Sequence, residues 1–298
     1  TGTLANVVNF EVLNVKGGAW ALTDDHTYAR GATVAAGATL TIGNGATAGS
    51  LTADIANTGA LVFDRSDAAS YAGTIFGSGS LTKVNTGTLT LSGIHTYTGA
   101  TTISGGTLAL SGAGAVAVSS GVALATGAAL DISGLTGAGT AITALTDTAP
   151  GQAGTVALGA KTLAITNANG SFGGTISGSG GLTLAGGTQT LTGANTYTGA
   201  TTILGGTLRA GAAGSFAPAS TVTVAGGANL DLANFSQTIG SLAGAGTVAL
   251  GSGTLHAGGD NASTAFSGAI VGTGDLFKEG TGLLTLAGVN TYTGLTFV

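Results

Sequence analysis

The chain has no cysteine and no methionine among its 298 residues. Without cysteine it can form no disulfide, no thiolate zinc site and no cysteine nucleophile. Charged residues make up only 6% of the chain, against about 25% in an average globular domain. The seven Lys and Arg residues form no cluster. Because a protein that binds nucleic acid needs a basic patch, this composition argues against nucleic acid as a partner.

Long apolar runs are also missing. The chain has no stretch of 18 apolar residues, so we predict no membrane-spanning helix and no embedding in a membrane. The first residues lack the basic and apolar regions of a signal peptide, and we expect the chain to be a segment of a larger protein. Hydrophobic residues still make up 43% and glycine accounts for 57 residues. Disordered chains combine high charge with low hydrophobicity, so we expect a folded protein with a sizeable core.

Repetition is the main signal in what remains. One phrase occurs three times, as TGTLTLSGIHTYTGATTISGGTLAL at residues 86–110, GTQTLTGANTYTGATTILGGTL at 187–208 and TGLLTLAGVNTYTGLTFV at 281–298. A second phrase precedes each copy, at residues 71–81, 172–182 and 266–276. We therefore predict one continuous domain over residues 1–298, with long repeats of about 90 to 100 residues at 33–122, 123–222 and 223–298.

A shorter rhythm runs within each long repeat. The segments TLTL at Thr88 and TLAL at Thr107 start 19 residues apart, and each alternates an apolar with a small or polar residue. Such alternation is typical of strands, and glycine-rich stretches between strands are typical of turns, where glycine supplies positive φ angles. Short strands at this spacing predict an all-β fold, a right-handed parallel β-helix (solenoid) with about 20 residues per coil.

Two other all-β architectures explain the pattern less well. A β-propeller needs blades of about 40 to 50 residues with four antiparallel strands. A β-sandwich does not account for three copies of one phrase. In the β-helix, we expect Leu and Ile to point inward and Thr, Ser and Asn to point outward.

The phrases GTLTLSG, TYTG, TTI and GGTL resemble the passenger-associated transport repeat (autotransporter-associated β-strand repeat) of bacterial autotransporters. The resemblance implies a secreted or surface-displayed passenger, often involved in virulence, that is exported through the outer membrane with its own C-terminal outer-membrane β-barrel as partner. It also implies adhesion to a host surface protein or glycan, or self-association. The chain departs from a full autotransporter because signal peptide and barrel are absent and because the third copy stops at LTFV.

The tyrosine of the TYTG phrase recurs at Tyr97, Tyr197 and Tyr292. An aromatic stripe that binds sugar rings is one interpretation. A corner residue that covers the end of the sheet core is the other, and recurrence in every copy favours it. The slot two residues earlier holds His95, Asn195 and Asn290, which we expect to hydrogen-bond corner backbone.

The histidines His26, His95 and His256 are far apart, and none has a second ligand at metal spacing. Asp24 and Asp25 precede His26, where a solvated loop is favoured over a metal site. The phrase GGANLDL at residues 226–232 faintly resembles a calcium-binding repeat but occurs once. We therefore predict no metal-binding and no cofactor-binding residues.

Asp131 and Asp231 match between copies, and Thr41 fills this position in the first copy. A catalytic carboxylate pair requires a separation of about 5 to 10 Å, whereas one long repeat places these residues several coils apart. We expect outward strand positions for them. FDRSD at residues 63–67 is either an exposed loop that contacts a partner or only a surface ion pair. No G-x-S-x-G elbow occurs, and we predict no catalytic residue and no enzyme activity.

The leading hypothesis for function is a structural or adhesive β-helical scaffold. One alternative is a mechanical stalk that presents a functional domain lying outside this chain. A less favoured alternative is a β-helix enzyme that acts on polysaccharide, because its site needs several acidic or basic residues on neighbouring coils, and the twelve acidic residues here are dispersed.

Overall fold

The fold is a parallel β-solenoid. The computed structural model describes residues 1–4 and 11–298. Within this part of the chain there are 39 strands and no helix, and the described strand pairs are parallel. About 14 turns follow one another, with equivalent strands roughly 20 residues apart. The predicted parallel β-helix with about 20 residues per coil is therefore confirmed. None of the described residues forms a helix that could cross a membrane.

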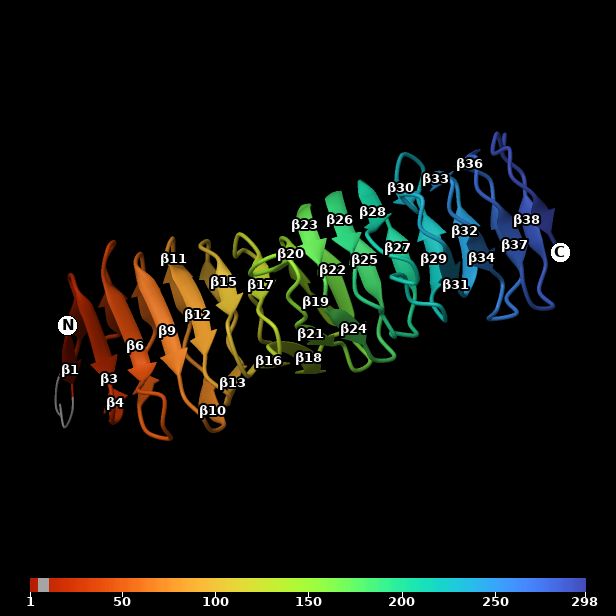
Figure 1. The fold of residues 1–298 in the computed structure, drawn as a ribbon. Coiled ribbons are helices and arrows are strands. Elements are labelled where there is room, and N and C mark those ends of the chain that lie inside the picture. The colour runs from red at the N-terminus through yellow and green to blue at the C-terminus, as the bar shows by residue number, and fades with distance from the viewer. Residues whose placement is uncertain (5–10) are drawn as a thin grey trace. The chain divides into compact units, whose positions relative to one another are not determined.

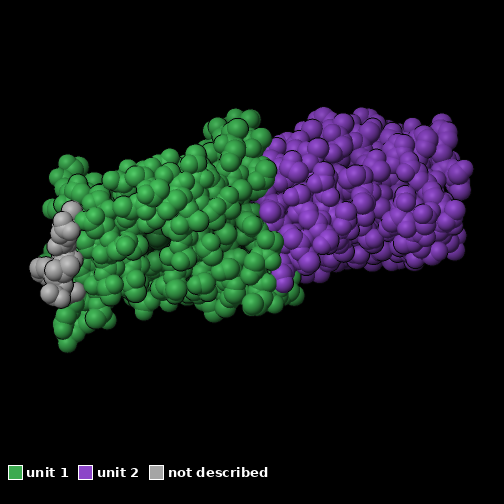
Figure 2. Space-filling model, turned by 90° about the horizontal axis from the view of Figure 1, so that it is seen from below, with its two compact units in different colours: residues 1–143, 148–155 green, residues 144–147, 156–298 purple. Residues whose placement is uncertain are grey.

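The chain divides into two compact units, which Figure 2 shows in separate colours. Unit 1 comprises residues 1–143 and 148–155, and unit 2 comprises residues 144–147 and 156–298. The single domain and the three long repeats expected from the sequence stay predictions.

Three sheets run through unit 1, and each coil contributes one strand to a sheet (Figure 1). The first sheet contains β1 (Gly2–Leu4), β3 (Ala19–Leu22), β6 (Thr39–Gly43), β9 (Ala60–Asp64), β12 (Ser80–Val84), β15 (Thr101–Ile103) and β17 (Val122–Leu124). The second contains β10 (Ala69–Tyr71), β13 (Thr88–Leu91), β16 (Thr107–Gly112) and β18 (Ala129–Leu135). The third contains β2 (Leu13–Val15), β5 (Ala32–Val34), β8 (Ile55–Asn57), β11 (Ile75–Gly77) and β14 (Thr96–Tyr97). A separate pair consists of β4 (Asp25–Thr27) and β7 (Ser50–Thr52).

Unit 2 repeats this arrangement. Its first sheet contains β22 (Thr162–Ile165), β25 (Leu182–Leu184), β27 (Thr201–Ile203), β29 (Thr221–Val224), β32 (Ser241–Gly244), β35 (Thr264–Phe266) and β38 (Leu284–Leu286). Its second contains β23 (Ala168–Phe172), β26 (Gly187–Leu191), β28 (Thr207–Ala210), β30 (Asn229–Asp231), β33 (Thr247–Gly251) and β36 (Ala269–Gly272). Its third contains β31 (Gln237–Ile239), β34 (Leu255–Ala257), β37 (Leu276–Lys278) and β39 (Thr296–Phe297). The remaining strands are β19 (Gly139–Ile142), β20 (Leu145–Asp147), β21 (Thr155–Ala157) and β24 (Thr175–Ser177).

The core consists of columns of aliphatic side chains, one from each coil. In the second sheet of unit 1, Leu89, Leu108 and Leu130 are in register, and all three are buried. The alternating residue Thr88 is half-exposed, as the period-2 pattern predicts. Burying one Leu side chain completely contributes about 2 kcal/mol, so the free energy of folding is spread along the columns.

The corner glycines serve two different purposes. Gly106 and Gly206 have φ angles of 61° and 74°, the left-handed region that we expected glycine to occupy. Gly99, the glycine of TYTG, has a different role. A Cβ atom on Gly99 would lie 2.3 Å from the carbonyl oxygen of Gly79 in the preceding coil. Glycine is therefore required at this position by the close approach of two coils.

Equivalent phrases of unit 2 lie on different sheets. The second copy places Thr201–Ile203 in the first sheet as β27, whereas the third places the equivalent Thr296–Phe297 in the third sheet as β39. Thr296 follows Thr201 by 95 residues, which is not a whole number of coils. The third copy is therefore shifted around the solenoid relative to the second.

Candidate functional site

The tyrosines of the first two TYTG phrases are core residues. Tyr97 and Tyr197 are 0% and 1% exposed. Each hydroxyl lies 2.6 Å from the Oγ1 atom of a threonine four residues later, Thr101 or Thr201. Burial raises the pKa of Tyr197 to about 12, although hydrogen bonds from neighbouring hydroxyls oppose this. These rings are inaccessible to a ligand, so they act as the packing residues that the sequence favoured.

The arrangement in unit 2 also rules out an aromatic stripe. Tyr197 follows Thr196, whose amide donates to the carbonyl of Ile176 in β24. Tyr292 follows Thr291, whose amide donates to Ile270 in β36. These two strands belong to different sheets. The two tyrosines therefore lie on different faces and form no continuous column.

The slot two residues before each tyrosine holds an acceptor for the preceding coil. His95, Asn195 and Asn290 each accept a hydrogen bond from an isoleucine amide about 20 residues earlier. The bonds run from Ile75 N to His95 Nδ1 at 3.1 Å, from Ile176 N to Asn195 Oδ1 at 2.7 Å and from Ile270 N to Asn290 Oδ1 at 2.9 Å. The slot residues bond to backbone as expected, but the donor is the amide of a buried strand residue and not of an exposed corner. Each bond joins two successive coils.

The Asp24–His26 segment differs from expectation. We predicted a solvated loop, but Asp25 to Thr27 form β4 and His26 is only 2% exposed. The imidazole of His26 stacks on Tyr28 with ring centroids 6.0 Å apart. Asp25 accepts a hydrogen bond from the Ser50 hydroxyl at 2.7 Å. Residues 1–4 and 11–298 contain no group of three His, Cys, Asp or Glu side chains that could hold a metal ion.

The sequence analysis missed one aromatic cluster on the third sheet of unit 2, because its residues are about 20 positions apart. His256 and Phe277 stack with ring centroids 4.7 Å apart, and Phe277 stacks on Phe297 at 4.1 Å. The Nδ1 atom of His256 lies 2.7 Å from Oε1 of Glu279. The three rings are in register on the neighbouring strands β34, β37 and β39. Predicting this alignment requires the exact number of residues in each coil.

Asp131 and Asp231 take the predicted outward strand positions. Both side chains are half-exposed, in β18 and β30. Each carboxylate accepts a hydrogen bond at 2.8 Å from an amide two residues later, that of Ser133 or Ala233. Asp131 belongs to unit 1 and Asp231 to unit 2. Thr41, in the equivalent place of β6, is also half-exposed.

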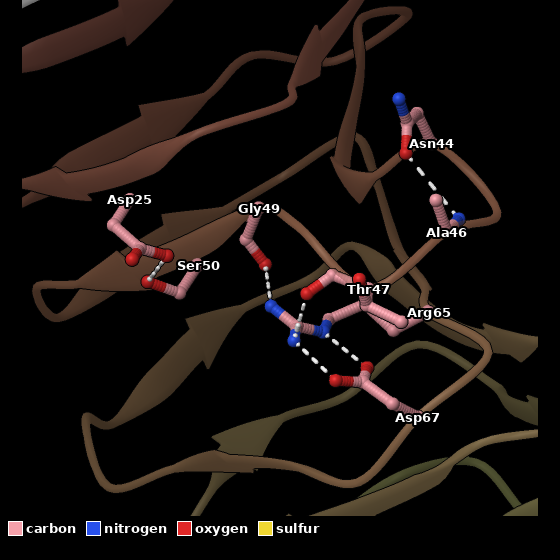
Figure 3. A network of polar contacts seen from close by, with 8 residues as sticks. All are labelled: Asp25, Asn44, Ala46, Thr47, Gly49, Ser50, Arg65 and Asp67. Carbon is pink, nitrogen blue, oxygen red and sulfur yellow. Dashed lines mark hydrogen bonds and ion pairs between the residues drawn. The ribbon is translucent and has the colours of Figure 1, made fainter.

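The FDRSD phrase forms a clamp instead of a free surface ion pair. Figure 3 shows the Arg65 guanidinium directed toward the Asp67 carboxylate and the carbonyls of Thr47 and Gly49. Its Nε and Nη2 atoms donate to the two carboxylate oxygens of Asp67 at 2.8 and 2.7 Å. The Arg65 side chain is 14% exposed. The hydrogen bond from Arg65 lowers the pKa of Asp67. Arg65 therefore fixes the loop between β6 and β7.

Two shallow depressions flank the corner at Thr52–Asp54 in unit 1. One, about 440 Å³ in volume, also involves residues 27–31. The other, about 470 Å³, also involves Leu51, Ser70, Ala72 and Gly73. We call the two depressions together the corner groove. Its walls combine polar groups, such as those of Thr52, Asp54 and Arg30, with about as much apolar surface. The polar groups can form hydrogen bonds with hydroxyl-rich or peptide ligands.

The similarity to known proteins lies in the repeated phrase. Three segments match the passenger-associated-transport-repeat family, at residues 81–110, 186–210 and 276–298. They contain Tyr97, Tyr197 and Tyr292 with their slot residues. The resemblance to autotransporter passenger repeats is confirmed by these matches.

One curated relative is an adhesin. The chain is 57% identical over 53 residues to the Adhesin BmaC autotransporter of Brucella suis biovar 1 (strain 1330). The match covers 18% of this chain and 2% of the relative, so the chain spans a small part of that protein's length. No solved structure matches this chain.

Proposed function

We propose that this chain is a segment of an autotransporter passenger, secreted or displayed on the bacterial surface, that acts as a structural or adhesive β-helical scaffold. The main observation in support is that the recurrent tyrosines of the first two repeats are buried in the core, where each is hydrogen-bonded to a threonine. The repeats therefore build the scaffold, and its outward faces are left for contact with partners. The adhesin name of the relative supports this proposal.

The partners follow from the same relationship. The passenger's own C-terminal outer-membrane β-barrel is its partner in export, and the location is the cell surface or the medium. On the outside, we propose contact with a host surface protein or glycan, or with other copies of the chain. The corner groove supports a ligand role because polar groups in its walls, among them Thr52 and Asp54, can form hydrogen bonds with hydroxyl or amide groups.

Binding assays with the purified chain test adhesion. Immobilised host matrix proteins and glycans serve as ligands, and clumping of cells that display the chain reports self-association. Thr52→Arg places a long charged side chain in the corner groove, where Thr52 is exposed. Thr188→Arg is the matched control, since Thr188 is an exposed threonine of unit 2. Loss of binding in the first variant alone supports adhesion through the groove.

The opposite results identify the alternatives. A displayed chain that binds no ligand and causes no clumping would contradict adhesion and favour a mechanical stalk. We infer a non-enzymatic role from the repeat family and the solenoid fold. Release of reducing sugars from a polysaccharide by the purified chain would contradict that inference.

A further inference from the structure

The slot before the TYTG tyrosine contains a titratable side chain in one copy only. Asn195 and Asn290 offer an amide oxygen to the preceding coil, and this oxygen remains an acceptor at every physiological pH. His95 offers the lone pair of Nδ1 to the amide of Ile75. An imidazole nitrogen accepts a hydrogen bond only while it carries no proton. The first copy is therefore held by a bond that acid can remove.

The second nitrogen of His95 makes this position still more sensitive. With Nδ1 accepting, the ring proton lies on Nε2, which is buried and has no hydrogen-bond partner. In the second copy, Nδ2 of Asn195 donates to the carbonyls of Gly193 at 3.1 Å and Ser215 at 2.7 Å. Asn195 thus satisfies its donors and its acceptor, whereas His95 satisfies its acceptor alone.

We propose that His95 makes the first repeat an acid-sensitive coil, in which a proton on Nδ1 breaks the bond to the Ile75 amide and opens residues 75–97. The added proton would point at another N–H donor. It would also place a positive charge at a site that is 2% exposed. A buried charge with no partner is costly, so opening the coil to water becomes the cheaper state.

The surroundings supply little to compensate the charge. From β10, the ring of Tyr71 stacks on His95 with centroids 6.1 Å apart. Its hydroxyl donates to the carbonyl of Ala53 at 2.6 Å. Burial raises the pKa of Tyr71, and the carboxylate of Asp54 raises it further. For His95, burial lowers the pKa, and no carboxylate acts against it. From the following coil, the carbonyl of Ala115 accepts a hydrogen bond from the backbone amide of His95, and the ring Nε2 has no hydrogen-bond partner.

The direction and range of the effect follow from linkage. Burial lowers the pKa of His95 from 6.5 to about 4. Between these values the opened coil binds a proton that the closed coil does not bind. Stability is therefore complete above pH 6.5 and falls as the pH decreases toward 4. The equilibrium constant for closing the coil is expected to be about 30-fold smaller at pH 5 than at pH 8.

Hydrogen exchange on the full chain tests the proposal. The protection factor of the Ile75 amide should fall about 30-fold between pH 8 and pH 5, after correction for intrinsic exchange. In His95→Asn, which copies the residue of the other two repeats, this pH-dependent loss should disappear. In Asn195→His, the same loss should appear at the Ile176 amide, which bonds to this slot.

Several outcomes would overturn the idea. Equal protection of Ile75 at both pH values in the wild type is one. Persistence of the acid effect in His95→Asn is another. Proton NMR of the wild type gives an independent readout that does not depend on folding of a variant. His95 should titrate below pH 5, and titration near pH 6.5 in the folded chain contradicts the proposal.

Discussion

The first and third repeat segments, residues 81–110 and 276–298, carry almost the same phrase but differ in burial. Tyr97 is completely buried, whereas the equivalent Tyr292 is half-exposed. Both hydroxyls bond to the threonine four residues later. The local contact is thus a property of the phrase, while burial depends on the coil that stacks on top. The following coil covers the first copy, whereas the third copy lies in the last coil that the structure describes.

Two lysines show the same contrast. Lys83 is 1% exposed, and its Nζ donates to the carbonyls of Val84 at 2.6 Å, Asn85 at 2.9 Å and Gly105 at 3.3 Å. The equivalent Lys278 donates to the carbonyls of Glu279 and Gly280 alone, at 2.5 and 3.1 Å. The third carbonyl in the first copy comes from the following coil. One coil therefore completes the hydrogen bonds of the coil before it.

The largest expected difference between the two segments concerns core leucines. Leu89 is 1% exposed, and the equivalent Leu284 is half-exposed. Leu89→Ala should lower the free energy of unfolding by about 4 kcal/mol, because it removes buried surface and leaves a cavity. Leu284→Ala should cost about 1 kcal/mol. Urea denaturation measures both, and equal losses would show that the following coil is unimportant for burial.

The next prediction concerns contacts with the preceding coil, which are present in both copies. Cβ atoms on Gly99 and Gly294 would lie 2.3 and 2.1 Å from carbonyl oxygens of the preceding coil. Gly99→Ala and Gly294→Ala should each destabilise their own coil by about 3 kcal/mol, since the backbones must separate. Hydrogen exchange of the neighbouring amides measures this. Gly226→Ala is the control, because no atom lies within 4 Å of its added Cβ.

A smaller effect is expected at the two lysines. Lys83→Met keeps the length of the side chain and leaves three carbonyls without their donor, at a cost of about 2 kcal/mol. Lys278→Met should cost less than about 1 kcal/mol, because water reaches its carbonyls. Thermal unfolding of the two variants gives the comparison. A larger loss for Lys278→Met would contradict the role given to the following coil.

The smallest effect concerns the tyrosine hydroxyl. Tyr97→Phe leaves the buried Thr101 hydroxyl without its partner and should cost about 1.5 kcal/mol. Tyr292→Phe should change the free energy of unfolding by less than about 0.5 kcal/mol, since Thr296 is exposed. Denaturation at neutral pH distinguishes the two. Similar costs at both positions would mean that the hydroxyl contact acts independently of burial.

Local patterns predicted much of this protein, and their failures have a common cause. Alternation and turn spacing are properties of neighbouring residues, so strands, coil length and the packing role of Tyr97 could be predicted. The pairing of His256 with Glu279 joins residues of successive coils. Coil lengths vary, as between the register steps Thr88 to Thr107 and Thr101 to Val122. Contacts between coils therefore depend on an insertion or deletion of one or two residues.

Two segments were predicted to lie at the surface because they are charged, and the structure places their central side chains elsewhere. The DDH segment appears polar, yet His26 points inward because strand β4 alternates and its neighbours Asp25 and Thr27 point outward. In FDRSD, Arg65 reaches carbonyls of Thr47 and Gly49 that lie in the preceding coil. Neither partner is near Arg65 in the sequence. The local sequence pattern predicted surface positions for both segments, because it contains no information about contacts between coils.

The amino-acid sequence by itself determined that this chain is a Gly- and Thr-rich parallel β-solenoid with repeats of the autotransporter passenger type. Period-2 alternation and turn spacing act locally, and stacking then needs only similar neighbours. Tertiary structure decided which copies are covered, on which sheet each phrase lies and which side chains meet. Those outcomes depend on the summed lengths of successive coils and on burial by the next coil, which no single segment specifies.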